Sequence, residues 1–455
     1  MPLRNLMLIA IAMVTSLVCY NQATRNRYSS LITEVMSVVE SNYLEPVERR
    51  ELFDHAMSGM ISGLDPYSGY MPAEEYKPFS EGIDQQFGGI GVLVEVNPET
   101  KRLTVMSPLF GTPAYEAGIR SGDTIMSING KDTEGLELRE AVKLMKGDPN
   151  TQVTVGIKHR GEDEVSDLTL TRRIIQTESV LGDQRQDGAV WDFHLQEDPR
   201  IAYLRLESFG AKTADEVRTA LTNKDGTFGD FQAIILDLRG NPGGMLMTAV
   251  EICDMFLDSG VIVSTRGRGG AAEAIYEATP GTLVPANVPV VVLINQYSAS
   301  ASEIVAAALQ DHQRATIIGQ RTWGKGTVQN VIELDGGKSG LRLTTSSYWR
   351  PSGVNIHRKK DAQENEMWGV SPSPGFEVKL TDDELRKVLE AREKRDLFRP
   401  YDDKPATTPE KKSGANKDEE VKDEKDKEEP PFDDPQLRKA IEHLQQQLMN
   451  AAKAK

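Results

Sequence analysis

The sequence predicts a multidomain α+β protein with a helical N-terminal region, an inserted small β domain and a layered α/β core. Apolar residues recur at helical spacing before about residue 80. Short strands punctuated by glycines occupy about 86 to 173, and apolar strands alternate with helices from about 200 to 380. A chain of 455 residues is also too long for one ordinary core, so it fits two or three domains.

The N-terminal region carries two apolar stripes typical of amphipathic helices. Leu31, Val35 and Val38 form the first stripe, and the second runs from Leu52 to Ile61. Prolines and a glycine between Pro66 and Pro72 end the helical pattern. The sequence therefore predicts helices up to about residue 80.

The first residues resemble an export signal. Arg4 precedes an apolar run from Leu6 to Tyr20, which has signal-peptide length and is short for a membrane span. No clear small-residue cleavage site follows, and Ser16–Cys19 is a poor lipid-attachment motif. We expect export to the bacterial periplasm or cell envelope. Whether the segment is cleaved or stays as an inner-membrane anchor is left open.

Composition excludes several classes of function. The formal net charge of -16 disfavours nucleic acid as a partner, because an acidic surface repels phosphate backbones. The two cysteines, Cys19 and Cys253, cannot build a disulfide framework or a zinc site. The six histidines show no ligand-like spacing, so we expect no metal and no cofactor.

The core prediction depends on apolar strands that alternate with helices. The predicted strands are Ile201–Leu206, Ala233–Leu238, Val288–Ile294 and Ala315–Ile318, and the predicted helices are Met245–Leu257 and Ser302–Leu309. Such alternation is typical of a sheet covered by helices.

A glycine-rich loop, Gly88–Val92, leads into the small β domain. Glycines let the backbone approach an anion closely, so the terminal carboxylate of a peptide fits this loop while the peptide adds a strand to the sheet edge. The peptide-binding residues are predicted to be Gly88, Gly89, Ile90, Gly91 and Val92. Strands at Thr151–Lys158 and Val165–Thr171, after a helix at Leu136–Met145, would close the domain.

The C-terminal part changes character. Residues 401 to 433 are rich in Lys, Asp, Glu and Pro and nearly lack apolar residues, which predicts disorder. A last helix follows, with an apolar face from Leu437 to Leu448. Two interpretations of this helix stay open here, a solvated tail and a helix packed on another protein molecule.

Three polar segments stand out in the core. They are Asp237–Gly244, Ser298–Glu303 and Thr322–Gln329, and the first two follow predicted strands directly. Ser300 opens a predicted helix, whose free N–H groups and dipole would stabilise an oxyanion. A Gly-Gly turn can supply a second donor. A lysine acts as a base only if burial lowers its pKa, and Trp323 and Val328 are expected as walls around Lys325.

Together these segments resemble the carboxyl-terminal processing (tail-specific) proteases, peptidase family S41. The motifs are Ser-Ala-Ser-Ala-Ser-Glu-Ile, Arg-Thr-Trp-Gly-Lys-Gly and Asp-Leu-Arg-Gly-Asn-Pro-Gly-Gly, and the glycine-rich module resembles a PDZ domain. The resemblance implies a crotonase/ClpP-like layered protease core with an inserted PDZ domain of β-sandwich-like form. The expected domains are 1–24 signal peptide or membrane anchor, 25–82 helical region, 83–175 PDZ domain, 176–395 protease core, 396–434 disordered charged linker and 435–455 C-terminal helix.

The resemblance also implies roles for single residues. Ser300 would be the nucleophile, Lys325 the general base, and Gln329 would orient the lysine. The N–H groups of Ala301 and Gly244 would form the oxyanion hole, with Gly243 as the less favoured donor. The implied activity is serine endopeptidase, with protein or peptide substrates that end in apolar C-termini. A homo-oligomer and N-terminal membrane association stay open.

Three rival interpretations compete with this one. Gly319–Lys325 matches a phosphate-binding loop, but Gly326 stands where Ser or Thr should bind magnesium. A Ser–His–Asp hydrolase would need His312 or His357. A catalytically silent envelope scaffold that binds the C-termini of other proteins would keep the PDZ domain without turnover.

Overall fold

The computed structural model describes residues 3–23, 27–186, 190–363, 365–396 and 432–453. Most of the linker predicted at 396–434 lies outside these residues. The protein divides into two compact units, one made of residues 1–77 and 329–344, and the other of residues 78–328 and 345–455.

The first unit contains the predicted N-terminal helices. Its helices are α1 (Leu3–Ala23), α2 (Arg27–Asn42), α3 (Arg49–Ser62) and the start of α4 (Ala73–Ile83). Among the described residues, no helix has both the length and the apolar character needed to cross a membrane. The short strand β1 (Gly69–Met71) pairs antiparallel with residues 340–342 of β21 (Ser339–Trp349).

Asp65 holds the turn between α3 and β1. Its carboxylate accepts hydrogen bonds from the backbone N–H groups of Tyr67 and Ser68, at 2.8 and 2.9 Å. It also accepts one from Thr344 Oγ1 in β21, at 3.1 Å. Burial alone would raise the pKa of Asp65, but these donors and the Ser68 hydroxyl lower it.

The second unit begins with a small antiparallel β domain built around its own core. The strand order is β3-β4-β5-β7-β8, with β6 paired to β5, and β2 pairs with β9 apart from this sheet. Apolar residues such as Leu103, Ile125 and Val155 fill its interior. The elements are β2 (Gln86–Gly89), β3 (Val92–Val96), β4 (Leu103–Pro108), α5 (Pro113–Glu116), β5 (Thr124–Ile128), β6 (Lys131–Asp132), α6 (Leu138–Met145), β7 (Gln152–Lys158), β8 (Val165–Thr171) and β9 (Arg173–Gln176).

The larger domain of this unit is a sheet with helices on both faces. The strands β14, β15, β18 and β19 are parallel neighbours, and the antiparallel strands β10 and β13 pair with β14. Each expected core strand is confirmed within two residues at either end except β14, which begins three residues earlier. The strands are β10 (Val180–Leu181), β13 (His194–Leu195), β14 (Asp198–Leu206), β15 (Ala233–Asp237), β18 (Val290–Ile294) and β19 (Ala315–Gly319).

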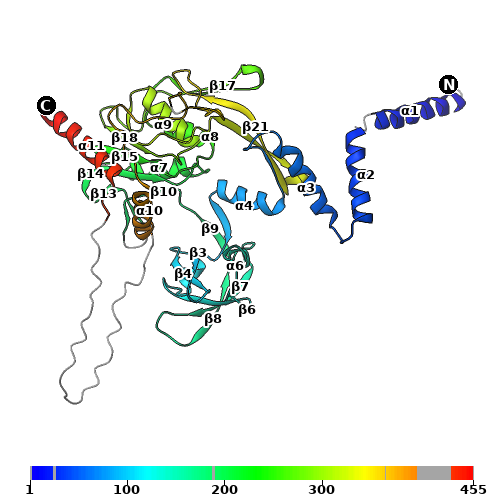
Figure 1. Ribbon diagram of the computed structural model, residues 1–455, viewed down its shortest axis with the longest axis horizontal. Coiled ribbons are helices and arrows are strands. Elements are labelled where there is room, and N and C mark those ends of the chain that lie inside the picture. The colour runs from blue at the N-terminus through cyan, green and yellow to red at the C-terminus, as the bar shows by residue number, and fades with distance from the viewer. Residues whose placement is uncertain (1–2, 24–26, 187–189, 364, 397–431, 454–455) are drawn as a thin grey trace, which may run out of the picture. The chain divides into compact units, whose positions relative to one another are not determined.

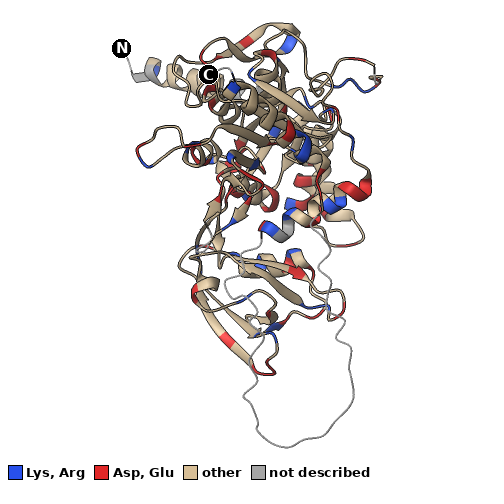
Figure 2. Cartoon of the chain, turned by 90° about the vertical axis from the view of Figure 1, so that its left-hand side faces the viewer, with Lys and Arg blue, Asp and Glu red and all other residues tan. Residues whose placement is uncertain are grey.

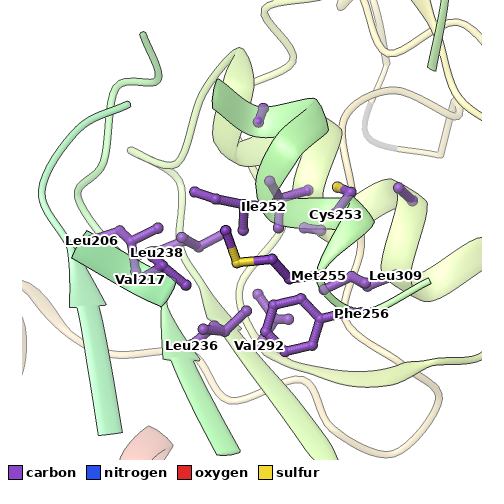
Figure 3. Close-up of a cluster of buried hydrophobic side chains, with 14 of the residues drawn as sticks. Leu206, Val217, Leu236, Leu238, Ile252, Cys253, Met255, Phe256, Val292 and Leu309 are labelled. Atoms are coloured by element: carbon purple, nitrogen blue, oxygen red, sulfur yellow. The ribbon is translucent and has the colours of Figure 1, made fainter. Parts of the chain in front are cut away.

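Alternate residues of the parallel strands point to opposite faces, so the sheet has two apolar surfaces. One surface packs against α7 (Thr213–Leu221), α8 (Leu246–Asp254) and α9 (Ala301–Asp311). Figure 3 shows part of this core, where the free thiol residue Cys253 lies among buried apolar side chains.

The opposite surface is covered by the C-terminal helix α11 (Pro435–Lys453). Leu437, Ile441 and Leu444 pack against Tyr203 and Ile235 of the sheet. Figure 1 shows the red α11 beside β15 and β18. The interpretations of this helix as a solvated tail or as a contact with another molecule were therefore wrong, because its apolar face fills the second surface of its own sheet.

A second sheet was not predicted. In this unit β16 (Val261–Arg266) pairs antiparallel with β17 (Ala272–Glu277) and with the end of β21. The remaining elements are β11 (Gln184–Arg185), β12 (Trp191–Asp192), α10 (Asp382–Asp396) and β20 (Thr327–Leu334), which runs from this unit into the first one. Figure 2 shows positive and negative residues interspersed along the described residues despite the net negative charge.

Candidate active site

The three polar segments follow three adjacent parallel strands. Asp237–Gly244 continues from β15, the segment up to Ser300 follows β18, and the segment up to Lys325 follows β19. The carboxyl ends of parallel strands meet at one edge of a sheet, where α/β proteins place their sites. The fold therefore brings the predicted motifs to the same edge.

Ser300 lies at the start of α9 in an unusual backbone conformation. It is the N-cap residue, with φ 58° and ψ -113°, and it is 5% exposed. A positive φ at a residue other than glycine is strained and is found mainly at functional sites. The strain points to a constraint on where this serine must sit.

The neighbouring serines have structural roles instead. Ser298 Oγ donates to the carbonyl oxygen of Leu238 at 2.8 Å, and Ser302 Oγ donates to that of Asn241 at 3.0 Å. Both hydroxyls thus tie the start of α9 to the loop after β15. Their engagement agrees with the choice of Ser300 over these two serines.

The Gly-Gly turn packs directly against Ser300. A Cβ atom on Gly243 would lie 2.7 Å from Ser300 Cβ and 2.9 Å from Ala301 N, so only glycine fits. The Gly243 N–H donates to Asn241 Oδ1 at 2.8 Å. In contrast, neither the Gly244 N–H nor the Ala301 N–H donates to an acceptor within the described residues.

Lys325 is half-buried, and its backbone is fixed by Glu303 of α9. Glu303 Oε2 accepts hydrogen bonds from the Lys325 N–H at 2.8 Å and from the Ser300 N–H at 2.9 Å. Both predicted catalytic residues are therefore one hydrogen bond away from the same oxygen atom.

The expected apolar walls around Lys325 are found only in part. Val328 packs against the core under the helices, but Trp323 is 50% exposed and its N–H donates to the Ser298 carbonyl. Gln329 falls in the first unit, where its amide nitrogen donates to Thr344 Oγ1 at 3.3 Å.

Tyr348 and Glu303 were given no role by the sequence, yet both lie beside the predicted site. Tyr348 is 4% exposed, and its N–H donates to the Gly326 carbonyl at 2.8 Å. Burial raises the pKa of its phenol to about 12, while a hydrogen bond with the Ser300 side chain acts in the opposite direction. A signal was present for Glu303, which lies in the serine motif, but none marked Tyr348.

The structure weighs against two rivals. His312 caps the far end of α9, roughly 18 Å along the helix from Ser300 by the usual rise per residue, and its Nε2 lies 2.8 Å from the Val261 carbonyl. A phosphate loop needs a helix after its lysine, but strand β20 follows Lys325. His357 stays a candidate, since its backbone packs against Gly326.

The glycine-rich loop connects β2 to β3, the edge strand of the small β domain. Gly88 and Gly89 belong to β2, and a Cβ on Gly88 would lie 2.1 Å from the Gly147 carbonyl oxygen. Ile90 is buried, and Gly91 adopts a φ of 76°. Val92 then begins β3, the outer strand of the sheet, which has β4 as its only neighbour among the described strands.

A metal site is not formed by the described residues. They contain no group of three His, Cys, Asp or Glu side chains arranged to hold an ion.

Comparisons with known proteins identify families whose models match parts of this chain. Family models match at residues 200–372 for peptidase family S41, 104–158 for the PDZ domain, and 16–75 for the N-terminal domain of the activating protease CtpB. The sequence resemblance is thereby confirmed.

Similar proteins span most of the sequence. This protein is 36% identical over 390 residues to a carboxy-terminal-processing protease of Bartonella bacilliformis, and the match covers 85% of this protein and 86% of the relative. It is 37% identical over 317 residues to a carboxyl-terminal-processing protease of Synechocystis, covering 69% and 70%. A solved photosystem II D1 C-terminal processing protease shows 28% identity and a TM-score of 0.41, covering 78% of this protein and 93% of that one.

Proposed function

The chain belongs to peptidase family S41 and is a serine-type peptidase, and we propose that it is an endopeptidase that holds substrate C-termini on its PDZ domain. In this proposal Ser300 and Lys325 form the catalytic dyad. The observation that carries it is the shared Glu303 oxygen, which brings the backbones of both residues together at the start of α9.

The chemistry follows from these positions. Ser300 Oγ attacks the scissile carbonyl carbon while Lys325 Nζ takes the hydroxyl proton. The negative oxygen that forms accepts hydrogen bonds from the N–H groups of Gly244 and Ala301, which have no acceptor of their own among the described residues. Lys325 then returns the proton to the leaving amine, and water hydrolyses the acyl-enzyme. Gln329 orients the lysine.

Substrate recognition is assigned to the glycine-rich loop and strand β3. A peptide that adds to the outer edge of β3 gains backbone hydrogen bonds, and its terminal carboxylate reaches the loop Gly88–Val92. Because backbone contacts do not read sequence, apolar side chains at the substrate C-terminus supply the preference. The assigned peptide-binding residues are Gly88, Gly89, Ile90, Gly91 and Val92.

A further part of the proposal concerns the compartment. Helix α1 carries the apolar run expected of an export signal, and we assign the enzyme to the bacterial periplasm or cell envelope. Fractionation of cells that express the full protein distinguishes a cleaved leader from a retained anchor. Full-length protein found in the cytoplasm would contradict export.

The dyad is tested by comparing Ser300→Ala and Lys325→Ala with the unmutated protein on a loosely folded substrate with an apolar C-terminus. We expect kcat/KM to fall at least about 1,000-fold in both variants. Lys360→Ala, which removes an exposed lysine, is the matched control and should keep full activity.

The same assay separates the rivals. Full activity in Lys325→Ala would refute the Ser–Lys mechanism, and activity lost in His357→Ala alone would favour a histidine base. The catalytically silent scaffold predicts that the unmutated protein binds the peptide and never cleaves it. Peptide binding by Ser300→Ala, followed by fluorescence anisotropy, should match that of the unmutated protein.

A further inference from the structure

The Glu303 carboxylate is fully buried between the segments that carry the dyad. Its side chain is 0% exposed, and it lies at the third position of α9. A carboxylate is rarely buried completely unless it is paired or fully hydrogen-bonded. Its hydrogen bonds therefore show what it holds in place.

Four donors surround this carboxylate, two on each oxygen. Oε2 accepts from the N–H groups of Ser300 and Lys325, at 2.9 and 2.8 Å. Oε1 accepts from Thr322 Oγ1 at 2.5 Å and from the Gly324 N–H at 2.7 Å. One side chain thus joins the nucleophile segment to the lysine segment.

A third segment seals the cluster. Thr322 Oγ1 also accepts the Val370 N–H at 2.8 Å. A Cβ on Gly369 would lie 2.6 Å from Thr322 Oγ1 and 3.1 Å from Glu303 Oε1, so the backbone there closes over the carboxylate. The bonds around Glu303 are consequently shielded from competing water, which makes them stronger than exposed ones.

We infer that Glu303 is a positioning residue for catalysis. Its ionised carboxylate fixes the backbone positions of Ser300 and Lys325, so that the serine hydroxyl and the lysine amine lie where they can react. This inference rests on the proposed Ser–Lys mechanism. Glu303 touches no substrate atom; it acts through the two residues it holds. A misplacement of about 1 Å at a reacting group can cost about 100-fold in rate, so such a link has kinetic consequences.

The ionised form follows from the chemistry of the partners. All four are placed as donors to the carboxylate, whereas a protonated carboxyl would turn one acceptor site into an O–H directed at a donor. Burial raises the pKa of Glu303, and its four hydrogen bonds oppose that rise. The titratable or charged side chains on the described segments packed around it are those of Arg321 and Lys325, Tyr348 beside Ser300, His357 beside Gly326, and Arg358 beside Gly324.

A simple helix cap would be a lesser role. Capping requires only that Glu303 accept the N–H of the N-cap residue Ser300. The other three donors belong to residues 322–325, which capping leaves unexplained. Glu384 offers a comparison, because it caps α10 by accepting the Thr381 N–H and hydroxyl at 2.8 and 2.9 Å on an exposed surface.

The test compares Glu303→Gln with Glu384→Gln, which removes an equivalent capping carboxylate away from the dyad. An amide has an NH2 group in place of one carboxylate oxygen, so the donors that face this NH2 group lose their acceptor. We expect Glu303→Gln to lose about 100-fold in kcat with KM within about threefold, and its Ser300 to react correspondingly slower with a fluorophosphonate. Glu384→Gln should match the unmutated protein in both assays.

The pH profile supplies a readout that a purely structural role would not move. Two groups must lose protons in the unmutated enzyme, Glu303 and the general base. The slope of log kcat/KM against pH should therefore approach 2 on the acid side, and fall to 1 in Glu303→Gln. If this variant does not fold, Thr322→Val, which removes one of the four donors and leaves the carboxylate in place, should also lower kcat, and an unchanged kcat in it would overturn the inference.

The outcomes separate this inference from the proposed function. Loss of cleavage in Ser300→Ala supports the nucleophile, whereas a fully active Ser300→Ala variant refutes the proposed mechanism itself. Labelling of Glu303→Gln at the wild-type rate, or a loss confined to KM or to folded yield, would refute only the positioning role.

Discussion

At the residue scale, Gly243 and Gly240 test the placement of the oxyanion hole. Both lie in the loop after β15 with left-handed backbone angles, φ 100° and 80°. A Cβ on Gly243 would meet Ser300 and Ala301, whereas one on Gly240 would meet no atom within 4 Å. Replacing either glycine by alanine would therefore strain the backbone, but only the alanine at position 243 would also clash with neighbouring atoms.

We expect Gly243→Ala to lower kcat/KM at least about 100-fold, because the new methyl group displaces Ser300 or the donors beside it. Gly240→Ala should cost about 1 kcal/mol of stability through strain alone and keep its activity. Steady-state kinetics and thermal unfolding of both variants measure this. Equal activity in the two would mean that the oxyanion does not form beside Gly243.

Residue types were easier to predict than residue roles. The motif spacing identified Ser300 and Lys325 as candidates, and the helix start marked Ala301 as a candidate donor. The role of Glu303 could not be predicted, because three of its partners lie 19 to 22 residues away and only the fold brings them together. The positive φ of Ser300 likewise depends on tertiary packing.

At the element scale, buried strands were predictable and exposed ones were not. Val290–Ile294 is buried at every position, so it reads as a continuous apolar run typical of a parallel sheet. Ala272–Glu277 in β17 is mostly exposed and includes two glutamates, so no apolar pattern marked it. The second sheet was missed for this reason.

Helix α11 shows a similar limit. Its apolar spacing predicted a helix with one apolar face, but the pattern does not say which surface, if any, receives that face. The receiving surface is formed by alternate residues of the parallel strands, such as Ile201 and Tyr203. A parallel sheet needs cover on both faces, which accounts for the position that α11 takes.

Helix α11 should therefore contribute to the stability of the core. Leu444 is 0% exposed and Met449 on the same helix is 55% exposed. We expect Leu444→Ala to cost about 3 kcal/mol in unfolding free energy, and Met449→Ala to cost little. Thermal unfolding at several protein concentrations checks this. An effect of Leu444→Ala that disappears on dilution would point to packing between molecules instead.

At the scale of the whole molecule, buried carboxylates tie distant parts of the second unit together. Burial alone would raise the pKa of Asp237, but Arg239 and Arg392 hold it well below the usual range. Arg239 also bonds Asp434 and Gln436, so the end of β15 is joined to the start of α11. The net charge of -16 therefore includes carboxylates that stabilise the fold.

Asp198 links two elements that are far apart in the sequence, and its pKa lies in a range that can be reached experimentally. It sits at the start of β14, where it pairs with Arg200 and accepts a hydrogen bond from Gln445 of α11 at 3.1 Å. These partners, Arg200 first, lower its pKa from 3.8 to about 2. Because the folded-state pKa lies below the unfolded one, the ionised group stabilises the fold above about pH 4, and this contribution is lost as the pH falls towards 2.

Asp198→Asn should therefore be most harmful at neutral pH. A shift of this size corresponds to at most about 2 kcal/mol, and solvent screening reduces it because the partner Arg200 is 47% exposed. We expect the variant to unfold at lower temperature than the wild type at pH 7, and the difference to shrink as the pH falls from about 4 to 2. Asp230→Asn, which removes the same charge from an exposed residue, is the control for net charge. A difference that stays constant across this range, or that Asp230→Asn reproduces, would mean that the link between β14 and α11 does not carry this stability.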